Sequence, residues 1–189
     1  MTQSMPLTNH LLIAMPSLRH LAFSKTVIYV CEQCPEETVG IIINKPMNAM
    51  VNVVYEQLGL KAPQPSDHQW PLLFGGPMQT ERGFVLHRPC GHWRSSLSLV
   101  DPQVTITTSN DIIRAMSKNQ GPKEALLALG YVAWDEKQLE QEIMDNVWLV
   151  CPFKSELLYD VPFMERWHAA GSLLGVNMDQ LVSSIGHAG

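Results

Sequence analysis

Several features of familiar protein classes are missing from this sequence of 189 residues. Its 13 Lys and Arg residues are scattered, so no basic cluster exists to displace counterions from a phosphate backbone. No apolar run approaches the ~20 residues of a membrane-spanning helix. The apolar run 11–15 ends at Pro16 and follows no Lys or Arg, unlike a signal peptide. We therefore expect a cytoplasmic protein that binds neither nucleic acid nor membrane.

Motifs that would identify an enzyme are also missing. There is no Gly-x-Ser-x-Gly turn that would present a catalytic serine. Gly75, Gly76 and Gly83 lack the spacing of phosphate-binding loops, and a predicted strand, not a helix, follows Gly83. We therefore assign no catalytic residue and no cofactor, and the sequence favours a non-enzymatic protein over an enzyme.

Composition and length indicate one folded domain over residues 1–189. The sequence is 46% apolar and only 16% charged, which supplies enough apolar surface to form a core. The longest polar loop, 61–70, is too short to separate two domains. The net charge of −5 is concentrated in the acidic segment 135–145.

Hydrophobic patterning predicts strands in the first half and mainly helices in the second. The predicted strands are 26–31, 39–44, 72–74, 84–87, 147–150, and a hairpin of 97–100 with 104–107. The predicted helices are 51–58, 110–117, one from Gly121-Pro122 to Gly130, one after Asp135, one from Pro162 to Gly175, and one from Asn177 to Gly186. This order is typical of an α+β fold.

Three further expectations concern details of these elements. The unbroken apolar run in 39–44 predicts a strand that is buried on both faces. Ser109 or Asn110 is expected to cap the helix that follows it, and Asp135 with Gln138 resembles a capping box. Trp134, Trp148 and Trp167 are expected in the core.

A series of short blocks resembles the bacterial YqgE/AlgH family nearly from end to end. The blocks are residues 11–16 (LLIAMP), 40–46 (GIIINKP), 75–77 (GGP), 82–87 (RGFVLH), 107–111 (TTSND), 128–131 (ALGY), 138–140 (QLE), 146–149 (NVWL) and 186–188 (GHA). The resemblance implies an α+β fold with a mixed or antiparallel sheet and a small barrel-like or bifurcated core surrounded by helices. Some members are labelled transcriptional regulators, but the family provides no catalytic residues to transfer.

Four cysteines raise the question of a metal or redox site. Cys31 and Cys34 have zinc-ligand spacing, and His87, Cys90 and His92 could add donors. However, Cys31 ends a predicted strand, where a thiol is usually a small buried apolar group. Cys34 leads into a turn and not into a helix that would lower its pKa. We therefore predict no metal site and reduced thiols.

Polar residues at the ends of predicted elements form the candidate binding site. These residues are Asn44, Gly75, Gly76, His87 and Ser109. They are expected to share one depression, with His87 partly accessible to solvent, because loops at one rim of a sheet gather binding groups. The alternative is structural: a hydrogen-bonded histidine, a tight glycine turn and a helix cap.

Two classes of function remain open from the sequence. The first is a non-enzymatic regulatory or adaptor protein that acts through an unidentified protein partner. The second is a small-ligand-binding protein, or an enzyme, that uses a pocket near His87, Asn44 and the Gly75–Gly76 turn. A pocket where these groups converge would favour the second class. A shallow site or an exposed apolar patch would favour the first.

Overall fold

The computed structural model describes residues 6–63, 70–98, 103–135 and 137–186. The strands are β1 (His10–Ala14), β2 (Val27–Gln33), β3 (Glu37–Ile42), β4 (Pro46–Met50), β5 (Pro71–Phe74), β6 (Met78–His87), β7 (Ser96–Ser98), β8 (Thr105–Thr107), β9 (Ala125–Asp135) and β10 (Trp148–Pro152). The helices are α1 (Asn52–Gln57), α2 (Asn110–Met116), α3 (Gln138–Met144), α4 (Ser155–Tyr159), the 3-10 turn η1 (Phe163–Glu165), α5 (Arg166–Leu173) and α6 (Met178–Gly186). Within these residues, no helix is long and apolar enough to cross a membrane.

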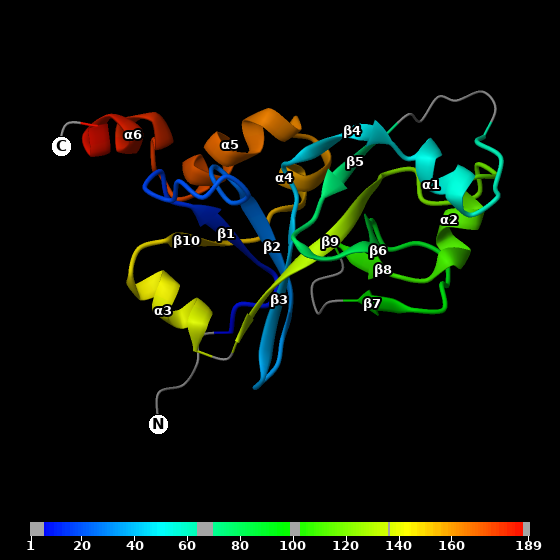
Figure 1. Ribbon diagram of the computed structural model, residues 1–189, viewed down its shortest axis with the longest axis horizontal. Helices are drawn as coiled ribbons and strands as arrows, with labels where there is room; N and C mark the ends of the chain where they lie inside the picture. Colours follow the sequence, from blue (N-terminus) through cyan, green and yellow to red (C-terminus); the bar gives the residue numbers. More distant parts are fainter. Residues whose placement is uncertain (1–5, 64–69, 99–102, 136, 187–189) are drawn as a thin grey trace.

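The strands form one curled sheet, a half-barrel with helices around it, as the α+β prediction requires (Figure 1). Its order is β10–β1–β2–β3–β9–β6–β8–β7, and β5 joins β9 and β4 beside this path. Every pairing is antiparallel except that of β5 with β9. The predicted hairpin is confirmed as the pair β7–β8, although its Asp101–Pro102 turn lies outside the described residues.

The central strand β9 belongs to both halves of the sheet (Figure 1). Residues 125–129 and Tyr131 pair with β6, and residues 132–135 pair with β3. The register between β9 and β6 is interrupted at Gly130, which has a φ of +77° and directly precedes the residues at which the partner changes. A β-carbon on Gly130 would lie 2.2 Å from the carbonyl oxygen of Gly76, and one on Gly76 would lie 2.1 Å from that of Tyr131. The two glycines therefore allow the turn before β6 to contact the backbone of β9 directly.

The prediction of a helix from Gly121–Pro122 to Gly130 is wrong, because residues 125–135 form β9. The segment Ala125–Leu129 contains good helix formers, which explains the error. Its burial nevertheless alternates along much of the strand, and it pairs with β6 on one side and β5 on the other. Tertiary pairing therefore outweighs the local preference.

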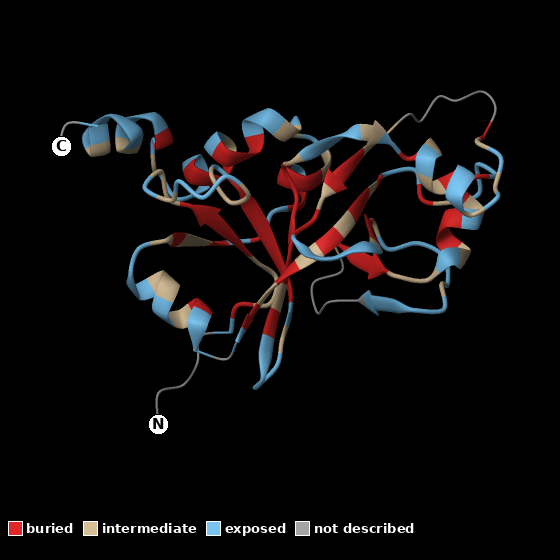
Figure 2. Cartoon of the chain, in the orientation of Figure 1, coloured by how far each residue is buried: buried red, intermediate tan, exposed pale blue. Residues whose placement is uncertain are grey.

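Strands β1, β2 and β3 are largely buried and mostly red in Figure 2, whereas β4 and the first half of β6 are exposed. Ile41 belongs to one apolar cluster with Tyr29 and Trp167, whereas its neighbour Ile42 belongs to another with Trp134. The prediction that this strand is covered on both faces is confirmed. Trp134, Trp148 and Trp167 are all buried, as expected.

Helix α3 contacts the sheet through its apolar residues Leu139 and Ile143 and through one carboxylate from the acidic segment. Glu142 accepts hydrogen bonds from the indole nitrogens of Trp134 (3.0 Å) and Trp148 (2.7 Å). The predicted capping box is wrong, because the cap position is Lys137 and it makes no side-chain cap bond. The carboxylate of Glu142 thus connects α3 to strands β9 and β10.

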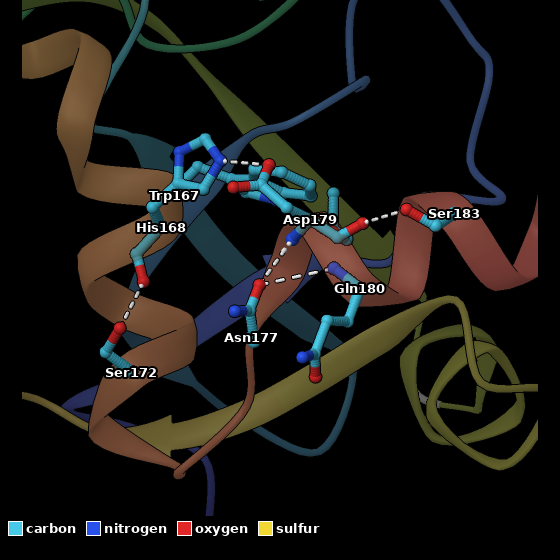
Figure 3. Close-up of polar contacts among 8 residues, drawn as sticks. Trp167, His168, Ser172, Asn177, Asp179, Gln180 and Ser183 are labelled. Carbon is cyan, nitrogen blue, oxygen red and sulfur yellow. Dashed lines mark hydrogen bonds and ion pairs between the residues drawn. The ribbon is translucent and has the colours of Figure 1, made fainter.

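The C-terminal helices follow the predicted pattern in part. The oxygen Oδ1 of Asn177 accepts the backbone N–H groups of Asp179 and Gln180, which confirms the predicted cap of α6 (Figure 3). The helix predicted from Pro162 is divided into η1 and α5, and Leu174 is 38% exposed, so its apolar stripe is shorter than predicted. Helix α4 was not predicted.

The guanidinium of Arg166 joins three segments in the interior. It is 3% exposed, and it donates hydrogen bonds to the carbonyl oxygens of Val161 (3.0 Å), Leu158 (2.5 Å) and Ile43. Burial lowers its pKa to about 10, so it remains a cation at neutral pH. The carbonyls of Leu158 and Val161 lie at the C-terminal end of α4, where a cation is favoured. Arg166 therefore ties α4 and α5 to the end of β3.

Candidate functional site

His87 lies at the end of β6, and the expectation that it is accessible to solvent is wrong. It is fully buried, and its Nδ1 lies 2.7 Å from the carbonyl oxygen of Arg88. A carbonyl can only accept, so Nδ1 carries the proton and Nε2 accepts from the hydroxyl of Thr107 at 2.9 Å. Thr107 in turn accepts from Ser96 at 2.8 Å. Both ring nitrogens are therefore satisfied inside the fold.

Burial lowers the pKa of His87, and this makes a pH-dependent prediction. The unfolded chain takes up a proton near pH 6.5, whereas the folded chain resists it. The wild-type protein should therefore lose stability as the pH falls below 6.5, by at most about 2 kcal/mol at pH 5 from this group. Urea unfolding at pH 7 and pH 5 should show a smaller loss in His87→Gln. An equal loss in both proteins would contradict the assignment.

Asn44 serves the sheet and not a ligand. It is 6% exposed, its Oδ1 accepts from the backbone N–H of Val27 and its Nδ2 donates to the carbonyl of Lys25, both at 2.8 Å. The backbone N–H of Gly75 donates to the carbonyl oxygen of Leu129, and the carbonyl oxygen of Gly75 accepts from the backbone N–H of Ile42. The side-chain amide of Asn44 and the backbone groups of Gly75 are thus both engaged within the fold.

Ser109 precedes α2, but its hydroxyl does not cap that helix. It accepts from the backbone N–H of Ser95 (3.1 Å) and donates to Oδ1 of Asp111 (2.6 Å). It also lines a depression of about 360 Å³ between α1, α2 and β6. Asn44, Gly75, Gly76 and His87 line neither this depression nor the two described below. None of these three depressions is therefore lined by all five predicted residues.

The cysteines differ in their burial and in their hydrogen-bond partners. Cys31 is buried and donates to the carbonyl of Val39, and burial raises its pKa to about 12. Cys34 is exposed and donates to the carbonyl of Glu37. All four thiols are free, and no group of three or more potential metal ligands occurs among the described residues.

The largest of the three depressions, about 400 Å³, lies on the concave face of the curled sheet. We call it the concave depression. Six strands that are consecutive in the sheet, β2–β3–β9–β6–β8–β7, each contribute to its wall. One contributor from each strand, in that order, is Glu32, Val39, Tyr131, Phe84, Ile106 and Leu97. Its size falls within the range of small-ligand sites.

The wall of the concave depression combines an apolar floor with charges of both signs. Phe84 packs edge-on against Tyr131, with ring centroids 5.8 Å apart, and the guanidinium of Arg82 lies 5.2 Å from the Phe84 centroid. Glu32 and Glu37 come from the β2–β3 hairpin. None of these three charged groups forms an ion pair within the described part of the chain. The site therefore offers a free cation and free anions above apolar surface.

A third depression, of about 370 Å³, lies beside α4 and η1 and includes Arg166. Its edge carries the ion pair of Arg88 with Glu124, and the Arg88 guanidinium lies 4.3 Å from the Tyr159 ring centroid. The donors of Arg166 are directed to carbonyl groups of the fold. Arg166 and Glu124 are thus engaged within the protein.

Comparison with known proteins decides the family. A protein-family model described as AlgH-like matches residues 11–179. The chain belongs to the AlgH-like family. A UPF0301 protein of Legionella pneumophila is 57% identical over 182 residues, which are 96% of this chain and 97% of that protein. A UPF0301 protein of Nitrosococcus oceani is 43% identical over 180 residues, covering 95% and 96%.

Solved structures confirm the fold of this AlgH-like chain. The solution structure of the AlgH protein from Pseudomonas aeruginosa superimposes with a TM-score of 0.79 at 39% identity and covers 96% of each chain. A crystal structure from Corynebacterium diphtheriae gives a TM-score of 0.66 at 20% identity, covering 89% and 87%, which shows the fold alone. The names of these proteins state no activity, so function must be argued from the site.

Sequence reasoning missed the charged residues of the concave depression, although two signals were present. Arg82 and Phe84 alternate in a strand and therefore share a face. Glu32 lies between Cys31 and Cys34, the two cysteines with zinc-ligand spacing. Arg82, Phe84 and Glu32 line one depression because the sheet curls. The alternation of side chains along a strand does not predict that curl.

Proposed function

We propose that this AlgH-like protein is a non-enzymatic regulatory or adaptor protein that acts in the cytoplasm through a protein partner. An extended segment of that partner would add a strand to the edge of β7. The observation that carries the proposal is that β7 pairs only with β8 among the described strands and forms one rim of the concave depression. Strand addition of this kind draws affinity from backbone bonds and specificity from a neighbouring pocket.

The register of β7 supports this geometry. Thr108 donates its backbone N–H to Ser95, and Ser96 stands opposite Thr107. Hydrogen-bonded pairs alternate along an antiparallel ladder, so the backbone N–H and C=O groups of Ser96 point away from β8. Ser96 and Leu97 are both exposed, and Leu97 is 41% exposed. The outer edge of β7 thus offers backbone groups beside an apolar side chain.

The other sheet edges are less suited to strand addition. Strand β4 begins with Pro46, which has no N–H, and its pairing with β5 is irregular. Strand β10 is packed against α3 through the Trp148–Glu142 bond. The scattered Lys and Arg residues argue for a protein partner over nucleic acid.

The proposal is tested by removing one outward N–H. A photo-crosslinking residue at position 97 should capture the partner, and mass spectrometry should identify the captured segment. A peptide of that segment should bind wild-type protein, and Ser96→Pro should weaken binding at least about 10-fold because proline cannot donate. Ser96→Ala is the matched control, since it loses the hydroxyl bond to Thr107 but keeps the N–H. Equal binding by both variants would refute strand addition at β7.

A further inference from the structure

We propose that the concave depression binds a small zwitterion of amino-acid or dipeptide size, with its carboxylate on Arg82 and its ammonium on Glu32 and Glu37. This inference goes beyond partner binding and does not depend on it, because it uses side chains inside the depression and not the edge of β7. It rests on the charges, the apolar floor and the volume of the depression.

Arg82 is suited to hold a carboxylate. Its guanidinium lies over Phe84, at 5.2 Å from the ring centroid, and forms no ion pair with a described residue. This ring contact leaves the N–H fork of the guanidinium free to donate two parallel bonds to a planar anion. Ser95 and Thr108 also line the depression and add hydroxyl groups to its wall.

Glu32 and Glu37 make a simple anion an unsuitable ligand. Both carboxylates line the same depression, so a ligand with only negative charge would meet two like charges there. A simple cation would meet Arg82 in the same way. Arg82 and Glu32 line this depression together with Cys31, so groups of opposite charge share its wall. A zwitterion can pair its carboxylate with Arg82 and its ammonium with Glu32 and Glu37.

The floor and the size of the depression restrict the ligand further. The floor includes Val39, Phe84, Ile106 and Tyr131, which belong to or pack on one apolar cluster and can contact a hydrocarbon side chain. A volume of about 400 Å³ is near the lower end of small-molecule sites. It suits a free amino acid or a dipeptide rather than a dinucleotide.

The experiment is a titration of the full chain with a panel of the free amino acids and representative dipeptides, followed by calorimetry and amide chemical shifts. At least one zwitterion should bind saturably and shift the amides of β2, β3 and β6. Its N-acetyl derivative and its C-terminal amide should each bind at least about 10-fold more weakly. Arg82→Gln and Glu37→Gln should each reduce affinity by a similar factor.

Matched controls separate this site from general surface charge. Arg114→Gln on α2 and Glu56→Gln on α1 change exposed charges that do not line the depression, and both should bind like the wild-type protein. The inference is overturned if no member of the panel binds, if the N-acetyl and amide derivatives bind as well as the zwitterion, or if Arg82→Gln has no effect. The Ser96→Pro variant keeps the charged groups of Arg82, Glu32 and Glu37. Binding of the zwitterion and binding of the partner peptide can therefore be measured separately in this variant, and one proposal can fail without the other.

Discussion

Gly130→Ala should lower the free energy of unfolding by at least about 4 kcal/mol, or prevent folding. Gly130 has a φ of +77°, which alone costs an alanine roughly 1–2 kcal/mol. Its β-carbon would also lie 2.2 Å from the carbonyl oxygen of Gly76, and backbone on both sides limits relaxation. Urea unfolding followed by circular dichroism measures the difference.

Gly59→Ala provides the matched control for this prediction. Gly59 has a φ of +65°, but a β-carbon there would have no heavy atom within 4 Å. It should therefore lose only the roughly 1–2 kcal/mol of backbone strain. If both variants lose the same amount, the close approach of β9 to the Gly75–Gly76 turn is not the cause.

Arg166→Leu should lower the free energy of unfolding by roughly 3–5 kcal/mol. Leucine can fill part of the space, but it leaves the carbonyl oxygens of Ile43, Leu158 and Val161 without the donors they have now. Each buried acceptor that loses its donor costs about 1–3 kcal/mol. Arg166→Lys should recover part of the loss, because one ammonium keeps the charge but cannot reach all three carbonyls in the same geometry.

Arg114→Leu is the control for the loss of an arginine as such. Arg114 is an exposed residue in the last turn of α2, and its replacement should change stability by no more than about 0.5 kcal/mol. Thermal and urea unfolding of the three variants should rank Arg166→Leu below Arg166→Lys and both below Arg114→Leu. A stability of Arg166→Leu equal to wild type would show that the three carbonyls do not depend on the guanidinium.

Local pattern was sufficient for the fold class and for most elements. Continuous apolar runs predicted the buried strand that contains Ile41 and Ile42, and the amide side chain of Asn177 predicted the start of α6. The failure over Ala125–Leu129 has a physical cause, since these residues favour a helix alone but lie between two strands in the fold. The start of β6 at Met78, well before the predicted 84, was missed for a similar reason, because polar residues 79–82 gave no strand pattern.

The candidate site was less predictable than the fold. Residues at the ends of strands were expected to gather ligand-binding groups, but Asn44 and His87 use their polar atoms to satisfy backbone and side-chain partners within the fold. The residues that do line the concave depression lie within or beside strands, on the face that the sheet curls around. Strand β9 pairs with β3, β5 and β6, which are distant from it in the sequence. These long-range pairings have no local sequence pattern from which they could be predicted.

The place of β9 late in the chain has a consequence for synthesis on the ribosome. Until residues 125–135 emerge, β3 has only β2 as a neighbour and β6 has only β8, so both open edges persist on the nascent chain. Strand β1 then waits longer still for β10 at residues 148–152. At translation rates of roughly 5–20 residues per second, the first two-thirds of the polypeptide spends several seconds as three separate sets of strands, β1–β2–β3, β4–β5 and β6–β8–β7. Completion of the half-barrel is therefore a late event set by the arrival of a single strand.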